Sequence, residues 1–144
     1  MKHSWPCLLL VAAFLGACSD NEAPPSEDHT PTTYSLLIND VPVTQPYTFI
    51  AGQSVRVRIK FFNADGVDLD EVADSHFGGL TFEPATLATV ARDSEHNYQL
   101  EVTGGEPGSG TLRVSYGHDD TADEHFLPVA SVNVTQQGGE NPDQ

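Results

Sequence analysis

The sequence predicts an all-β fold, an antiparallel β-sandwich of about seven strands. Hydrophobic and polar residues alternate with period two in several runs, which is the pattern of strands that bury one face. Clusters of Gly, Pro, Asn and Asp separate these runs, as turns between strands require. No segment sustains hydrophobic residues at helical spacing, so no long helix is expected.

Individual strands follow from this alternation. Val55, Val57, Ile59 and Phe61 alternate with Arg, Lys and a second Phe, which predicts a strand with one buried face. The clear runs are 55–62, 98–102, 112–116 and 126–134, and weaker candidates are 34–38 and 86–90.

The N-terminus has the features of an export signal. A short positive start precedes an apolar run from Leu8 to Leu15, too short for a bilayer span of roughly 20 residues. Leu15-Gly16-Ala17-Cys18 resembles the lipobox of bacterial lipoproteins, in which cleavage precedes the Cys and the Cys is acylated. The resemblance implies lipidation at Cys18, and Ser19 in place of Asp after it implies the outer membrane. The alternatives are a secretory signal with an incidental Cys, or a buried N-terminal helix.

These features divide the chain into four parts. Residues 1–17 are the expected lipoprotein signal peptide, and 18–33 are the lipidated Cys and a disordered tether rich in Pro and charged residues. Residues 34–135 are the expected β-sandwich domain, and 136–144 a flexible polar tail.

The charge balance excludes some classes of partner. Six Lys and Arg residues stand against 21 Asp and Glu, so the formal net charge is -15. A nucleic-acid-binding protein needs a basic face, which argues against that class. Loss of Lys2 with the signal peptide would leave five cations and a formal charge of -16. Lipidation of Cys18 and removal of Cys7 would leave no thiol for a disulfide, catalysis or a Cys-based metal site.

The middle section also resembles bacterial Ig-like domains. The resemblance covers roughly residues 34–135 and implies an Ig-like sandwich of Greek-key type. Such domains often place Trp at the position of Phe82, and they carry no catalytic residues that could be transferred. The resemblance rests on Ala51-Gly52-Gln53-Ser54-Val55, Asn63-Ala64-Asp65-Gly66, Leu80-Thr81-Phe82, Leu87-Ala88-Thr89-Val90 and Gly110-Thr111-Leu112-Arg113-Val114.

An Ig-like topology gathers many acidic and His residues at one end of the sandwich. The B–C connection (63–78) and the F–G connection (118–125) would share this end, which we call the loop pole, and His96 of the D–E turn would join its rim. Nine of the 21 acidic residues and three His would lie in the two connections.

This concentration of charge suggests a metal site. His118 and His125 would be cross-strand neighbours, and with His76 and a carboxylate they would form a nitrogen and oxygen set suited to Zn²⁺ or Cu²⁺. A set of carboxylates alone would suit Ca²⁺ instead. Alternatively, the acidic loops serve solubility and the His side chains bond to the backbone. The candidate metal ligands are His76, His118, His125, Asp74, Asp120 and Glu124.

Three of the five remaining cations share one strand face. Arg56, Arg58 and Lys60 would form either an anion-binding stripe or cross-strand pairs with Glu101 and other acidic neighbours. Exposed strands commonly carry such pairs, so pairing is the favoured interpretation.

The sequence therefore predicts a lipid-anchored cell-envelope binding module without catalytic activity, with a divalent metal at the loop pole as the sharper hypothesis. No nucleophile or phosphate-binding motif supports an enzyme. The alternative is a structural or adhesive module that binds another envelope or surface protein through a sheet face or edge. Phe62 and the C-terminal strand are the features that could extend a neighbouring sheet.

Overall fold

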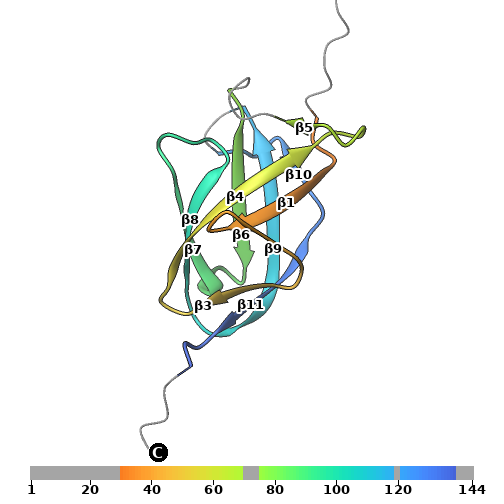
Figure 1. Cartoon of the computed structure of the whole chain (residues 1–144). Coiled ribbons are helices and arrows are strands. Elements are labelled where there is room, and N and C mark those ends of the chain that lie inside the picture. The colour runs from red at the N-terminus through yellow and green to blue at the C-terminus, as the bar shows by residue number, and fades with distance from the viewer. Residues whose placement is uncertain (1–29, 70–74, 119–120, 139–144) are drawn as a thin grey trace, which may run out of the picture.

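The computed structural model describes residues 30–69, 75–118 and 121–138, and it consists of two β-sheets packed face to face (Figure 1). Within this part of the chain no helix is long and apolar enough to cross a membrane. The elements are β1 (Thr33–Ile38), β2 (Val41–Val43), β3 (Tyr47–Ile50), β4 (Ser54–Phe62), β5 (Asp68–Leu69), β6 (Phe77–Glu83), the 3-10 turn η1 (Ala85–Leu87), β7 (Ala88–Arg92), β8 (Gln99–Gly104), β9 (Gly108–Gly117), β10 (His125–Phe126) and β11 (Ala130–Thr135).

The strand order confirms the predicted Ig-like sandwich. One sheet, which we call sheet A, has the order β2-β1-β4-β8-β7, with β5 paired to β4. The other, sheet B, has the order β10-β9-β11-β3, with β6 paired to β9. In the letters used for Ig domains, β1, β4, β8 and β7 are strands A, B, E and D, and β6, β9 and β11 are strands C, F and G. All pairs are antiparallel except β3 with β11, which is parallel.

The predicted strands are present, but several differ in extent. β9 begins at Gly108, four residues before the predicted run, and β8 continues to Gly104. The run 126–134 is divided into β10 and β11, because Pro128 has no N–H for the ladder. Leu127 still donates from its N–H to Val114 O at 3.0 Å, so β10 and β11 are two parts of one interrupted G strand. The run 86–90 begins instead with the η1 turn, and its strand extends from Ala88 to Arg92.

The core lies between the two sheets. The side chains that the period-two alternation predicts to be buried are found there. Val57, Ile59 and Phe61 of β4 are at most 1% exposed, as are Leu112 and Val114 of β9. Burial of such side chains removes apolar surface from water and is the main stabilising contribution to folding. The core residues all lie between Leu36 and Val134, so a fragment that starts at residue 19 contains the whole core.

Aromatic rings fill the end of the core that is nearest the loop pole. Phe61 contacts Tyr98 and Tyr116 with ring centroids 5.0 Å apart in both pairs, in edge-to-face geometry. At the other end, Phe82 packs edge-on against Phe49 with ring centroids 5.6 Å apart, so a smaller ring fills this position, where bacterial Ig-like domains often have Trp.

The C-terminal strand does not have a free edge. β11 is hydrogen-bonded to β9 on one side and β3 on the other, so it cannot extend a neighbouring sheet as the sequence suggested. Phe62 is half-buried and its strand, β4, is also paired on both sides.

Candidate functional site

The structure confirms that the B–C and F–G connections share one end of the sandwich. β4 and β9 both end at this loop pole, and β6 and β10 both start there (Figure 1). The D–E turn joins them, because Gly78 N, at the start of β6, donates to Asn97 O at 3.0 Å. His96, which the sequence placed at the rim, is exposed on that turn.

His76 is the buried member of the site. It immediately precedes β6, and only 6% of its surface is exposed. Its ring stacks on Tyr116 with centroids 4.6 Å apart and planes inclined by 13°, and the ring of His118 lies 3.9 Å away on a tilted plane. The B–C connection therefore delivers an imidazole onto the end of the aromatic core.

His118 is oriented by a carboxylate of its own connection. Its Nδ1 lies 2.5 Å from Glu124 Oε2, and an ionised carboxylate only accepts, so His118 donates. This hydrogen bond, with the nearby imidazole charges, lowers the pKa of Glu124 below its usual value. With Nδ1 engaged, Nε2 is the nitrogen of the neutral His118 ring that can coordinate a metal, and a carboxylate behind a metal-binding His commonly plays this part.

His125 is not the cross-strand neighbour of His118 that the sequence suggested. It is the ladder partner of Tyr116, not of His118, and its ring centroid is 6.1 Å from that of Tyr116. The predicted cross-strand pair of His118 and His125 is therefore offset by two residues. The Tyr116 ring neighbours the rings of both His76 and His125, a role that its position in a buried strand face did not reveal.

The metal set is only partly within the described residues, because Asp74 and Asp120 lie outside them. In residues 30–69, 75–118 and 121–138, no group of three or more His, Cys, Asp or Glu side chains is placed to hold a metal ion. Two imidazoles on one tetrahedral Zn²⁺ would have ring centres about 5 Å apart, given Zn–N distances of about 2.0–2.1 Å. The rings of His76 and His118 are closer than this, so they are in contact and a shared ion would require His118 to move.

In the described part of the B–C connection, Asn63 builds a turn and the carboxylate of Asp68 has an ion-pair partner. Asn63 Oδ1 accepts from the N–H groups of Asp65 and Val67, which closes the turn that the Asn-Ala-Asp-Gly sequence predicted. Asp68, on β5, pairs with Lys60 at 2.5 Å. Part of the acidic charge at this pole is therefore neutralised within the chain.

The D–E turn is also built by a carboxylate. Asp93 accepts hydrogen bonds from the N–H groups of Glu95 and His96 and from the side-chain amide of Gln99. These hydrogen bonds lower the pKa of Asp93, and the bond from the Glu95 N–H contributes most. Gln99 is a polar residue of the alternating run 98–102, yet it is only 4% exposed, and its amide is held between Asp93 and Arg58.

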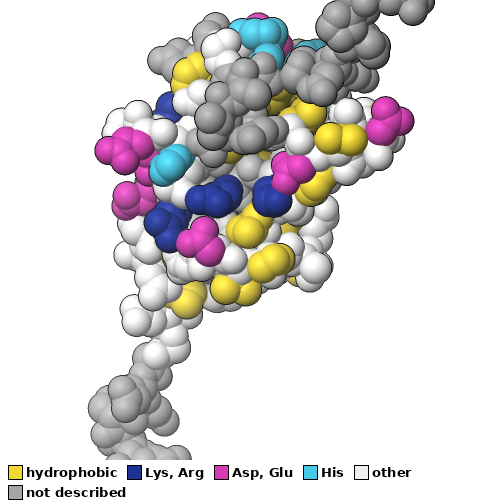
Figure 2. All heavy atoms as spheres, turned by 45° about the horizontal axis from the view of Figure 1, so that its top comes forward, with side chains coloured by type: hydrophobic (Ala, Val, Ile, Leu, Met, Phe, Trp, Pro, Cys, Tyr) yellow, Lys and Arg dark blue, Asp and Glu magenta, His cyan; other side chains and the backbone are white. Residues whose placement is uncertain are grey.

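The cations of β4 are paired, as the favoured interpretation predicted. Arg56 contacts Asp40 at 2.6 Å and Arg58 lies 4.0 Å from the same carboxylate, while Lys60 pairs with Asp68. The partners come from the β1–β2 turn and β5. Figure 2 shows Lys and Arg side chains gathered on this face with Asp and Glu side chains beside them. Such exposed pairs contribute roughly 0–1 kcal/mol each, and they leave no free anion-binding stripe.

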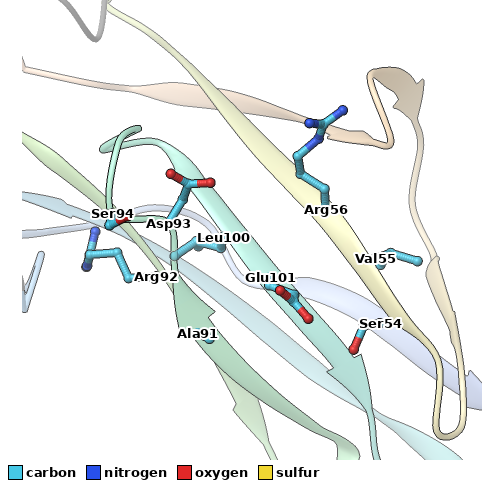
Figure 3. A pocket seen from close by; sticks show the side chains of 9 residues that line it. All are labelled: Ser54, Val55, Arg56, Ala91, Arg92, Asp93, Ser94, Leu100 and Glu101. Carbon is cyan, nitrogen blue, oxygen red and sulfur yellow. The ribbon is translucent and has the colours of Figure 1, made fainter.

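A shallow depression of about 390 Å³ lies on the outer face of sheet A (Figure 3). Arg56 on β4 and Glu101 on β8 are ladder partners within it, and Asp93 stands at its other side. Its opposite charges offset one another, and the Arg56 guanidinium is already paired with Asp40. The lining residues are Ser54, Val55, Arg56, Ala91, Arg92, Asp93, Ser94, Leu100 and Glu101.

Comparison with known proteins finds structural likeness alone. No known protein family matches the sequence, and no curated protein matches it. A crystal structure of domains 4 and 5 of the S-layer protein SbsC aligns with 74% of this chain at 15% identity and a TM-score of 0.45. A structure of SbsC domains 4–9 aligns with 76% of it at 17% identity and a TM-score of 0.49. The chain spans 54% and 15% of those two chains, and likeness at this level assigns neither a family nor a function.

Proposed function

We propose that this chain is a non-catalytic binding module of the bacterial cell envelope, anchored by a lipid on Cys18, and that it binds its ligand at the loop pole. The proposed lipid anchor and envelope location rest on Leu15-Gly16-Ala17-Cys18 and on the polar tether that follows it. The binding surface rests on one observation above all. Two separate connections bring His76, which stacks on the buried ring of Tyr116, into contact with His118.

The ligand proposed for this pole is a divalent transition metal, Zn²⁺ or Cu²⁺. His118 has the carboxylate support that metal-binding imidazoles use, and stacking on Tyr116 holds His76 in place beside it. Binding of one ion by both rings would move His118 away from His76. The full proposed set adds His125, Asp74, Asp120 and Glu124, of which Glu124 would act by orienting His118. Imidazole and carboxylate ligands together suit both metals.

A structural or adhesive role is the second candidate function. One specific observation favours it: the outer face of sheet B carries very little charge in a chain whose formal net charge is -15. A surface of this kind is suited to contact with another protein.

Fractionation of cells that produce the whole chain tests the anchor. The native chain is expected in the membrane fraction, and Cys18→Ala is expected to release the protein into the soluble fraction. Ser19→Ala is the matched control, since it leaves the lipidation residue intact. Membrane association that persists in Cys18→Ala would overturn the proposed anchor.

Calorimetric titration of the fragment 19–144 with Zn²⁺, Cu²⁺ and Ca²⁺ tests the ligand. We expect one transition-metal ion to bind with a Kd below about 1 µM, a free energy of about -8 kcal/mol. His118→Ala/His125→Ala should abolish this binding, while His96→Ala, on the D–E turn, should retain it. Weak binding that disappears at moderate salt would mean a charged surface without a metal site.

A further inference from the structure

The outer face of sheet B differs in charge from the rest of the molecule. Its strands contain one acidic residue, Glu83, and one Lys or Arg residue, Arg113, whereas the chain has 21 acidic residues. The other exposed positions of these strands are mostly Thr and Ser side chains, including Thr81, Thr111 and Ser131. This face is therefore electrically neutral.

The F–G connection limits the free part of this face at the end next to the loop pole. The connection lies against Gly79 and Gly117, where an added Cβ would meet Ala122 at 3.4 Å and 3.0 Å. Ala122 is fully buried there, and the acidic Asp123 follows it. The free part extends from this contact to the opposite end of the sandwich.

Arg113 and Glu83 are neighbours on the free part, yet they do not pair with each other. Arg113 is the ladder partner of Thr81, and Glu83 that of Thr111, so the two charges are diagonal neighbours. Among the described residues neither one makes an ion pair. Phe126 explains this: the guanidinium carbon of Arg113 lies 5.6 Å from its ring centroid, on the side of β9 away from β6.

We infer that this face binds a second copy of the chain, face to face, about a two-fold axis. The two-fold axis would lie in the plane of the contact, midway between Arg113 and Glu83 and perpendicular to the line that joins them. It brings each Arg113 opposite Glu83 of the second copy. Such reciprocal contacts are what a two-fold interface requires. No like-charge pair stands in this contact, so two acidic copies can meet here once salt screens their net charge. Phe126, which is 60% exposed, holds the Arg113 guanidinium beside it.

The size of the face makes this a weak dimer. Four strands at spacings of about 4.8 Å give a width of roughly 19 Å, and about six residues along each give roughly 20 Å. The footprint of roughly 400 Å² per copy is half that of a standard stable interface. Association is therefore expected at concentrations on the order of 100 µM.

Sedimentation equilibrium of the fragment 19–144, at about 0.15 M salt and from about 10 µM to about 500 µM, tests the inference over the expected range with the net charge screened. The native fragment should approach twice the mass of one chain as concentration rises. Arg113→Glu and Glu83→Arg should each weaken the association at least about tenfold, because each places two like-charge pairs in the contact. The double variant Arg113→Glu/Glu83→Arg restores opposite charges across the axis and should restore the dimer.

Arg56→Glu is the matched control, since it makes the same charge change on the outer face of sheet A and should leave the association unchanged. Circular dichroism of each variant confirms that it is folded. A native fragment that stays monomeric throughout would overturn the inference. So would a double variant as weak as the single ones, or a loss in Arg56→Glu equal to that in Arg113→Glu. None of these outcomes depends on metal binding at the loop pole.

Discussion

A continuous series of rings leads from the core to the surface of the loop pole. Phe61 contacts Tyr116, Tyr116 stacks on His76, and His76 lies against the exposed His118. Stacking fixes the buried imidazole, and Glu124 fixes the exposed one. The site is therefore positioned by individual contacts that can be tested one residue at a time.

The carboxylate of Glu124 provides the first test. Its hydrogen bond from His118 lowers its pKa, so we expect NMR to find Glu124 titrating below its ordinary value of 4.5. Because the folded-state pKa is depressed, the stabilisation is present above the unfolded-state value and is lost as pH falls through the folded-state value. In His118→Ala the Glu124 pKa should return towards 4.5, whereas His96→Ala should leave it low. Equal titration in the native protein and His118→Ala would contradict the pairing.

Tyr34 gives a prediction at alkaline pH. Burial is the main cause that raises the pKa of Tyr34 to about 12, and the adjacent Tyr47 is the second. The Tyr34 hydroxyl donates a hydrogen bond to Pro128 O at 3.2 Å. Since the folded-state pKa is raised above 10, this stabilisation is complete below pH 10 and is lost as pH rises towards 12. Urea unfolding should show Tyr34→Phe destabilised by about 1 kcal/mol at pH 8. Between pH 10 and 12 its stability should fall less than that of the native protein; an equal fall would contradict the assignment.

Alternation predicts that Gln99 lies on the outer face of sheet A, beside its ladder partner Arg58, but not that it is buried there. Its polar side chain is buried because two partners satisfy it, Arg58 from β4 and Asp93 from the D–E turn. The alternation within one strand identifies neither partner, so this burial depends on the register of the neighbouring strands.

At the scale of elements, Arg92 joins the end of β7 to the start of β6. Its Nη1 donates to Gly78 O at 3.1 Å, and its guanidinium lies 5.0 Å from the Phe77 ring centroid. We expect Arg92→Ala to lower the free energy of unfolding by roughly 1–3 kcal/mol, since a buried acceptor and a cation–π contact are lost. Arg113→Ala, which removes only an exposed cation–π contact, should cost less than about 1 kcal/mol. Equal losses in the two urea titrations would show that Arg92 does not join these strands.

The start of β9 passes so close to the end of β6 that Gly110 has no room for a side chain. An added Cβ would lie 2.2 Å from Glu83 O, which is backbone and cannot move independently. Gly110→Ala should therefore destabilise the protein by about 3 kcal/mol or more. Gly138→Ala, with nothing within 4 Å, should change stability by less than about 0.5 kcal/mol. Thermal unfolding of the two variants decides this, and similar melting temperatures would contradict the close approach.

The sequence predicted long strands better than short ones. β4 and β9 have clear alternation, but β3 covers only Tyr47–Ile50 and pairs with β11, which is far away in the chain. Nothing local distinguishes such a short strand from a loop. The break between β10 and β11, by contrast, could have been predicted from Pro128 in the sequence. The period-two pattern alone does not reveal it.

At the scale of the whole molecule, topology predicted the loop pole but not the contacts within it. The Ig-like order alone brings the B–C and F–G connections together. The contact of His76 with His118, and the offset of His125 from His118, depend on where β6 and β10 start relative to β9. The number of residues in the two connections does not predict these registers.

NMR titration of the isotope-labelled fragment 19–144 with Zn²⁺ tests most directly whether the loop pole is the binding surface. We predict that one equivalent of Zn²⁺ shifts or broadens the amide signals of His76, Tyr116, His118 and His125. Signals of Gly108 and Val134, at the opposite end of the sandwich, should stay unchanged. Shifts spread over all acidic surfaces, or no shifts at one equivalent, would contradict a binding site at the loop pole.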